Sequence, residues 1–375
     1  MQAPASARPG ARLVSLDVFR GMTIAGMILV NNPGTWSAIY APLRHAPWHG
    51  WTLTDLIFPF FLFIAGVSTA FSFAARQARG ATRAALALHI LRRSAIIFTL
   101  GLFLNAFPAF KLATLRYPGV LQRIAVCYLA ASLLFLYSGR RARVAALVLL
   151  LFGYWALMTL LPVPGFGSGR LDPEGNLAAY VDRAVLPGKL WQSTWDPEGI
   201  LSTLPAMATL LVGIFLGEWL LAPRAPQRTA AGMMAMGAAG LALGQAWHLV
   251  FPINKNLWTS SYVVFTAGFA LVLLGACYWL VDVKGWRRWA TPFVVYGVNP
   301  IAAYFLSSLF ADVLGSFRTA LADGQAVSWK RFLFVKLFAP AASPVNASLL
   351  FALSYVLLWL GVMWLLYRRR VFIKI

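Results

Sequence analysis

Residues 31–68 read NNPGTWSAIYAPLRHAPWHGWTLTDLIFPFFLFIAGVS; here a long apolar helix ends, a polar loop crosses one membrane face, and a second apolar helix begins. Two of the four histidines in the chain, His45 and His49, fall in this loop. Asp55 follows inside the start of the second helix. Few other parts of the sequence bring proton-transfer groups so close together, so the rest of the chain is expected to be scaffold around this stretch.

The composition predicts a polytopic membrane protein. The 375 residues are 60% hydrophobic and only 11% charged, which is more apolar surface than a soluble domain can bury. A net charge of +21 is typical of many nucleic-acid-binding proteins, but here the basic residues lie in short loops between apolar runs, so no nucleic-acid partner is expected. Cys127 and Cys277 lie within apolar runs and need neither a disulfide nor a metal role.

Ten apolar runs of about 20 residues each are long enough to cross about 30 Å of hydrocarbon. Because backbone groups cannot stay unpaired in lipid, these runs must be helices, and the expected fold is an all-α transmembrane bundle forming a single domain over residues 1–375. The first run is expected to be an uncleaved span rather than a signal peptide. The runs lie near 13–31, 53–75, 86–107, 117–137, 143–162, 199–221, 229–249, 257–281, 290–312 and 346–367.

The orientation follows from the loops, because Lys and Arg are retained on the cytoplasmic side of a membrane. The basic leader, the even-numbered loops and the basic tail all alternate onto one face, which predicts that both termini are cytoplasmic. The His45 loop and the long segment 163–198 then face the periplasm. The segment 329–338 is too short to span, and its basic and aromatic residues predict an interfacial helix.

The tetrapeptide DPEG occurs twice, at 172–175 and 196–199. In the second copy, Asp196 is expected to cap a helix, with Pro197 at its first position and Glu198 in its first turn. This interpretation gives the segment a structural role, and a catalytic role for Glu198 is the alternative.

Charged groups within the apolar runs are costly in lipid and usually mark a site. Asp17 and Arg20 can pair on one helix face. Arg92 and Arg93 lie deep in the third run, where a guanidinium pair suits phosphate or carboxylate groups. Together with these arginines, other polar groups predict a polar cavity inside the bundle, although each alone could serve packing or capping: Gln122, Arg123, Asn254, Lys255, Asn256 and Asn299, which is followed by Pro300.

The two loop histidines differ in their neighbours. His49 lies between Trp48 and Trp51, as expected for an interfacial histidine in an aromatic belt. His45 has Asp55 available to orient its ring, and an imidazole held by a carboxylate is a common general base. Spacing alone leaves both interpretations of His45 open, because the dyad requires the loop to fold back on the second helix.

Several segments stand out in order along the chain: RLVSLDVFRGMTIAGMILVNN, RHAPWHGWTLTDLIFPFFLFIAGVS, YPGVLQRIAVCY, AAYVDR with DPEGILST, INKNLWTSSYV, and VDVKGW with TPFVVYGVNPI. They resemble the bacterial relatives of heparan-alpha-glucosaminide N-acetyltransferase over nearly the whole length. The resemblance does not extend to the large lumenal N-terminal domain and extra first helix of the lysosomal enzymes.

The resemblance implies an acetyltransferase that moves an acetyl group from cytoplasmic acetyl-CoA to the amine of a glucosamine-type sugar on the periplasmic side. It places the active-site histidine on His45, a functional asparagine on Asn31, and an acidic residue of the site on Asp55. The start of the chain and the arginine pair also resemble membrane enzymes that O-acetylate polysaccharides, so a hydroxyl acceptor is an alternative. A sugar transporter without acyl transfer is another.

The expected sites follow from these observations and the resemblance. The multi-pass chain is expected in the bacterial inner membrane, with the lipid bilayer, an amino-sugar or glycan acceptor and a second copy of the chain as partners, acetyl-CoA as co-substrate, and no metal. The candidate acetyl-CoA-binding residues are Arg92, Arg93, Arg20, Gln122 and Arg123. The candidate substrate-binding residues are Asn254, Lys255, Asn256, Trp258, Asn299 and Glu198.

Overall fold

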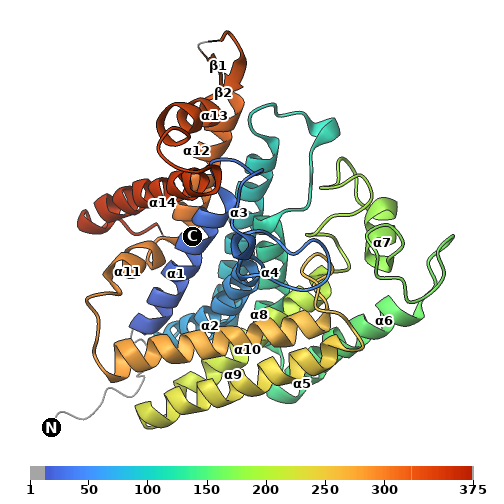
Figure 1. The fold of residues 1–375 in the computed structure, drawn as a ribbon. Helices are drawn as coiled ribbons and strands as arrows, with labels where there is room; N and C mark the ends of the chain where they lie inside the picture. The colour runs from blue at the N-terminus through green and yellow to red at the C-terminus, as the bar shows by residue number, and fades with distance from the viewer. Residues whose placement is uncertain (1–12, 322, 374–375) are drawn as a thin grey trace.

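The computed structural model describes residues 13–321 and 323–373, and its regular structure is almost entirely helical (Figure 1). The long helices are α1 (Val14–Asn31), α2 (Ile57–Gln77), α3 (Arg83–Ala106), α4 (Val120–Tyr137), α8 (Thr203–Leu221), α9 (Pro226–His248), α10 (Ser260–Tyr278), α12 (Pro300–Ser316) and α14 (Pro344–Arg368). The shorter helices are α5 (Arg140–Val148), α6 (Tyr154–Leu160), α7 (Leu177–Val185), α11 (Thr291–Gly297) and α13 (Trp329–Leu333).

The all-α polytopic bundle expected from the sequence is confirmed. Eight helical segments of the described chain are long and apolar enough to cross a membrane, or nine if the bent pair α11 and α12 is one span. The remaining expected run, 229–249, differs from the prediction. It forms α9, which has the length of a span but is less apolar than the others, because alanine, glycine and polar residues make up much of it.

The ninth expected run is broken where the sequence places Asn299 and Pro300. The axes of α11 and α12 differ by 83°, and Pro300 occupies the first turn of α12, where its missing N–H costs nothing. The Asn299 side chain donates to the carbonyl of Val371 at 3.0 Å and accepts from the N–H of Ile373 at 2.9 Å. The break is therefore tied to the chain end that follows α14.

Glycines let the most closely packed helices approach one another. α9 and α10 lie side by side (Figure 1), and a Cβ added at Gly268 of α10 would lie 2.6 Å from the backbone nitrogen of Leu241. α2 and α8 meet in the same way, since a Cβ at Gly66 would lie 2.0 Å from the carbonyl oxygen of Leu210. Lipid tails are as apolar as leucine, so close packing of this kind supplies much of the association energy inside a membrane.

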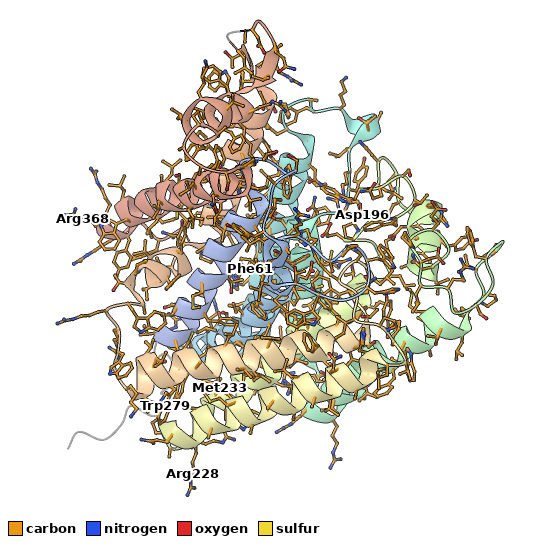
Figure 2. All side chains as sticks on the ribbon, in the orientation of Figure 1. Phe61, Asp196, Arg228, Met233, Trp279 and Arg368 are labelled. Carbon is orange, nitrogen blue, oxygen red and sulfur yellow. The ribbon has the colours of Figure 1, made fainter. Side chains whose placement is uncertain are left out.

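The main core lies where α2, α4, α8 and α10 meet. Trp258, just before α10, is 1% exposed and packs edge-to-face against Phe58 and Tyr262, with centroid distances of 4.9 and 5.4 Å. In Figure 2, Met233 lies within the bundle, whereas Arg228 projects outward into the surroundings. This core fixes the starts of α2 and α10, and the segments just before these two helices carry the site.

The segments between the long helices add smaller elements. A two-stranded antiparallel hairpin, β1 (Arg318–Ala320) with β2 (Ala326–Ser328), was not expected from the sequence. The predicted helix at 329–338 is present, as α13 continued by a π-helical turn over Phe334–Phe338. The segment 163–198 is mostly loop and contains α7.

Candidate active site

The loop between α1 and α2 is held to the bundle by the carboxylate of Asp55, which is 1% exposed. Asp55 lies in a 3-10 turn, Leu53–Leu56, that leads directly into α2. Its Oδ2 accepts hydrogen bonds from the backbone N–H groups of Thr52 and Ala46, each at 3.0 Å. Thr52 and Asp55 form a capping box, so the carboxylate that caps the 3-10 turn before α2 also fixes the end of the loop.

The other oxygen of Asp55 holds the imidazole of His45. Nδ1 of His45 lies 2.7 Å from Oδ1 of Asp55, so the loop folds back on α2 as the dyad requires. An ionised carboxylate places the proton on Nδ1, and Nε2 then carries a free lone pair. The His45 side chain is 47% exposed while that of Asp55 is 2% exposed, so the ring can meet a substrate and its orienting partner is shielded from water.

Lys255 completes a compact polar cluster around the ring. Its Nζ lies 3.1 Å from Nδ1 and 3.4 Å from Nε2 of His45, and 3.7 Å from Oδ1 of Asp55. Lys255 comes from the loop before α10, so two loops far apart in sequence converge here. Burial lowers the pKa of Lys255, and the nearby carboxylate of Asp55 opposes that shift.

A cavity of about 80 Å³ lies beside this cluster. Its lining includes the imidazole of His45, the ammonium of Lys255, the amide of Asn31 at the end of α1, and the carboxylate of Glu198 from the loop before α8. The cavity therefore brings together the histidine, an amide, an ammonium and a carboxylate. Its other lining residues are Met27, Val30, Thr54, Ile57, Phe58, Phe61, Val120 and Tyr304.

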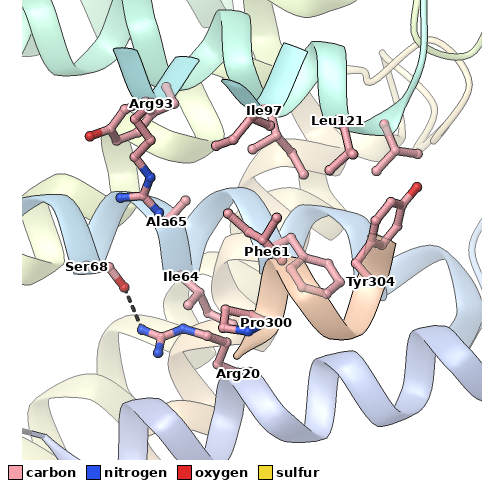
Figure 3. A pocket seen from close by; sticks show the side chains of 14 residues that line it. Arg20, Phe61, Ile64, Ala65, Ser68, Arg93, Ile97, Leu121, Pro300 and Tyr304 are labelled. Carbon is pink, nitrogen blue, oxygen red and sulfur yellow. Dashed lines mark hydrogen bonds between the residues drawn. The ribbon is translucent and has the colours of Figure 1, made fainter. Parts of the chain in front are cut away.

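A second cavity of about 220 Å³ is lined in part by the same residues, Phe61, Val120 and Tyr304. Figure 3 shows Arg20 and Arg93 on either side of α2, with Phe61 and Tyr304 toward the other end of this cavity. The remaining lining residues are mostly apolar side chains of α2, α3, α4 and α12. The two cavities are therefore neighbours, separated or joined at these three shared side chains.

The two arginines of the second cavity have different surroundings. Arg20 donates to Asp17 at 2.9 Å, to the carbonyl of Gly297 at 3.0 Å, and to the Ser68 hydroxyl at 2.8 Å. Arg93 lies over the ring of Tyr128, 4.8 Å from its centroid, and its Nε is buried without a hydrogen-bond partner in the part of the chain described. The expected Asp17–Arg20 pair is present, and Arg93 has hydrogen-bonding capacity left for a ligand.

Three other candidate cofactor residues do not line either cavity. Arg92 is exposed on the outer side of α3. Gln122 faces α3, since a Cβ added at Gly101 would lie 2.3 Å from its Oε1. Arg123 is 2% exposed, stacks over Trp258 at 5.1 Å, and donates to the hydroxyl of Ser202 at 2.5 Å. Gln122 therefore packs α4 against α3, and Arg123 joins α4 to the start of α8.

Most of the candidate substrate residues also lie elsewhere. Asn254 accepts from the N–H of Leu257 at 2.9 Å and lies 3.3 Å from Nδ1 of His49, so it stabilises the loop that carries Lys255. Trp258 donates through Nε1 to Thr209 at 3.1 Å within the core. Asn299 binds the chain end after α14, and Asn256 is partly exposed in the loop before α10. Lys255 and Glu198 alone of the six line the His45 cavity.

The predicted helix cap at Asp196 is wrong, because α8 begins only at Thr203, with Ser202 as its cap residue. The Asp196 carboxylate instead accepts from the N–H of Glu198 at 2.9 Å and from Arg116 at 2.6 and 2.7 Å. This pairing makes the intervening residues a turn rather than helix.

Sequence reasoning missed two residues of the site, Arg116 and Tyr304. Arg116 is a single arginine in the loop before α4, and its acidic partners are about 80 residues away, so no local pattern identifies it. Tyr304 is one aromatic residue among many apolar ones in α12. Tyr304 lies one turn after Pro300, and it reaches the cavity because the bend before α12 directs that helix past it.

His49 has surroundings unlike those of His45. It makes an edge contact with Trp48, with centroids 6.3 Å apart, and does not line the His45 cavity. Burial, together with nearby His248, lowers the pKa of His49. No three His, Cys, Asp or Glu side chains within 13–321 and 323–373 are grouped so that they could hold a metal ion.

Comparison with known proteins identifies the family. Residues 12–246 match the family described as heparan-alpha-glucosaminide N-acetyltransferase, catalytic. The human protein of that name is 32% identical over 422 aligned positions, and the mouse protein is 30% identical; both alignments cover 97% of this chain. The chain spans 60% of the length of each of these relatives. The chain therefore belongs to the heparan-alpha-glucosaminide N-acetyltransferase family.

Proposed function

We propose that this protein is a membrane-embedded acetyltransferase that transfers the acetyl group of acetyl-CoA to the amine of a glucosamine-type sugar, with His45 at the reacting centre. One observation carries the proposal. The His45–Asp55 dyad stands at the wall of a cavity that shares three lining residues with a second, arginine-bearing cavity. This arrangement supports a donor and an acceptor that approach the same imidazole from two sides.

The second cavity fits the arm of acetyl-CoA. Its lining is largely apolar, as a long thin acyl carrier needs, and the guanidinium of Arg93 has an unused donor at Nε. Arg20 lies about three turns before Asn31 on α1, which is about 16 Å at 1.5 Å per residue. Arg93 and Arg20, from the two sides of α2, would bind phosphate or carbonyl oxygens of the donor, while the thioester reaches the His45 cavity. Arg92 stays a candidate for the outer phosphates because it lies on the same helix.

The dyad performs the proton chemistry. A sugar amine attacks a thioester carbonyl only as the free base, so a proton must leave its ammonium form. With Nδ1 held by Asp55, the reacting atom of His45 is Nε2, whether it removes that proton or accepts the acetyl group before passing it on. Asn31 can donate from its amide to the oxyanion that forms on the carbonyl, as amides do in other acyl-transfer sites.

The two faces of the membrane supply the two substrates. The alternating basic loops support a topology in which both termini are cytoplasmic, the His45 loop faces the periplasm, and the arginines lie toward the cytoplasmic side. This arrangement explains how a cytoplasmic donor serves an external acceptor. Location in the bacterial inner membrane and pairing of two copies of the chain remain predictions.

Vesicles reconstituted with the purified protein test the proposal. Acetyl-CoA labelled in its acetyl group is sealed inside, and glucosamine is added outside in molar excess. The expected result is labelled N-acetylglucosamine outside, with unlabelled CoA retained inside. Parallel vesicles receive labelled glucosamine or glucose outside. Entry of labelled glucosamine without acetylation would show a transporter instead, and acetylation of glucose hydroxyls at an equal rate would show an O-acetyltransferase.

A further inference from the structure

The two DPEG segments have the same sequence but different surroundings. In the first copy, Asp172 pairs with Arg170 at 2.8 Å on an exposed loop, and Glu174 is exposed. In the second copy, Glu198 lines the His45 cavity, and its side chain is only 9% exposed. In both copies the aspartate accepts hydrogen bonds from backbone N–H groups of its own turn. That shared role does not explain why one of the two glutamates is directed into the site.

Arg116 holds Glu198 in that position. One guanidinium nitrogen donates to Asp196 at 2.6 Å and to Oε2 of Glu198 at 2.5 Å, while Nε donates to Asp196 at 2.7 Å. The Arg116 side chain also lies over Trp191, 5.0 Å from the ring centroid. Asp196 already gives Arg116 a bidentate partner, so Glu198 is an additional carboxylate rather than the one that neutralises this cation.

The Glu198 carboxylate has a free oxygen. Oε2 is bound by Arg116, whereas Oε1 makes no hydrogen bond within the described residues. Among the residues that line the His45 cavity, Glu198 supplies the one carboxylate, since Asp55 is enclosed behind His45. A fixed carboxylate with an unused oxygen in a small cavity is suited to a cationic ligand group.

We propose that Glu198 is the acceptor-recognition residue, and that its carboxylate binds the ammonium group of the amino sugar and thereby selects amines over hydroxyls beside His45. This inference rests on the proposed acyl transfer. A hydroxyl group in the same place carries no charge, so it forms the weaker neutral hydrogen bond. Arg116 and Asp196 act through Glu198, as positioning residues.

The test compares Glu198→Gln with Glu174→Gln, the same substitution in the same tetrapeptide away from the cavity. The amide retains an oxygen that can accept from Arg116, so the variant keeps the contact that orders the loop. Glu198→Gln should raise the KM for glucosamine about tenfold or more, with kcat changed much less, and Glu174→Gln should leave both constants unchanged. An unchanged KM in folded Glu198→Gln, or an equal rise in Glu174→Gln, would overturn the inference.

A binding measurement separates this inference from the proposed function. In a His45→Ala background, which needs no turnover, glucosamine should bind about tenfold or more tightly than glucose, and Glu198→Gln should remove that difference. The same discrimination is expected of the wild-type protein by competition, which keeps the test valid if Glu198→Gln does not fold. Equal affinity of the wild-type protein for the two sugars would overturn the assignment of Glu198. Tighter binding of glucosamine by a wild-type protein that transfers no acetyl group would refute the proposed function alone.

Discussion

Replacing Asp55 with asparagine tests how far catalysis depends on the orientation of His45. Asp55 accepts hydrogen bonds on both oxygens, from His45 on one and from the N–H groups of Thr52 and Ala46 on the other. An amide has a single oxygen. If that oxygen keeps the two backbone N–H groups, the NH₂ group faces Nδ1 of His45, and the imidazole must then carry its proton on Nε2.

The size of the effect follows from that contact. A hydrogen bond that involves a charged group contributes about 1.5–3 kcal/mol, and about 1.4 kcal/mol corresponds to a tenfold change in rate. Asp55→Asn should therefore lower kcat about 10- to 150-fold while the KM for acetyl-CoA changes little. The purified variant is assayed for acetyl transfer to glucosamine, with its melting temperature as the control for folding. Wild-type turnover by a folded variant would refute the orienting role.

Three further predictions concern the donor, the loops and the orientation. Arg93→Gln should raise the KM for acetyl-CoA about tenfold, whereas Arg92→Gln, which removes the exposed neighbour, should raise it less; the reverse order would assign the donor site to Arg92. Burial raises the pKa of Asp182 from an ordinary value of 3.8 to about 6, so the folded state binds the extra proton in this interval and stability should fall as pH rises from about 4 to 6. Asp182→Asn keeps an acceptor for the N–H of Ile200. In this variant the melting temperature should depend less on pH between about 4 and 6, and an unaltered dependence would contradict the assignment. A cysteine at Ser37 should react with an impermeant thiol reagent outside intact cells and one at Arg141 should not, and the opposite labelling would invert the topology.

The helical architecture could be predicted from the sequence because its signal is local. Twenty consecutive apolar residues imply a helix in lipid wherever they occur, and Pro300 marks the break that the structure shows as an 83° bend. The sequence was less informative at α9, whose alanine and glycine content serves contact with α10 rather than contact with lipid. It also misplaced the start of α8, because Asp196 binds Arg116 from a distant loop instead of capping the helix.

The candidate site divides in the same way. The pairing of His45 with Asp55 could be proposed from the sequence because the two residues are only ten positions apart in one short segment. Lys255, Glu198 and Tyr304 reach the same cavity from three other segments, and only the packing of α10, α8 and α12 brings them there. Sequence can nominate polar residues in apolar runs, but which side of a helix faces a cavity depends on its neighbours. Gln122 and Arg123 illustrate this limit. Their neighbours Leu121 and Ile124 in α4 line the second cavity, the one that contains Arg20 and Arg93, whereas Gln122 and Arg123 do not.

The most direct test of the central claim is acetyl transfer by His45→Ala compared with His49→Ala. Both variants are purified, checked for folding and for acetyl-CoA binding, and supplied with labelled acetyl-CoA and glucosamine. His45→Ala should bind acetyl-CoA as the wild type does but transfer no acetyl group, because the arginines of the donor cavity remain while the reacting imidazole is lost. His49→Ala should retain most activity. Substantial turnover by folded His45→Ala would contradict the assignment of His45 as the residue that carries the transfer.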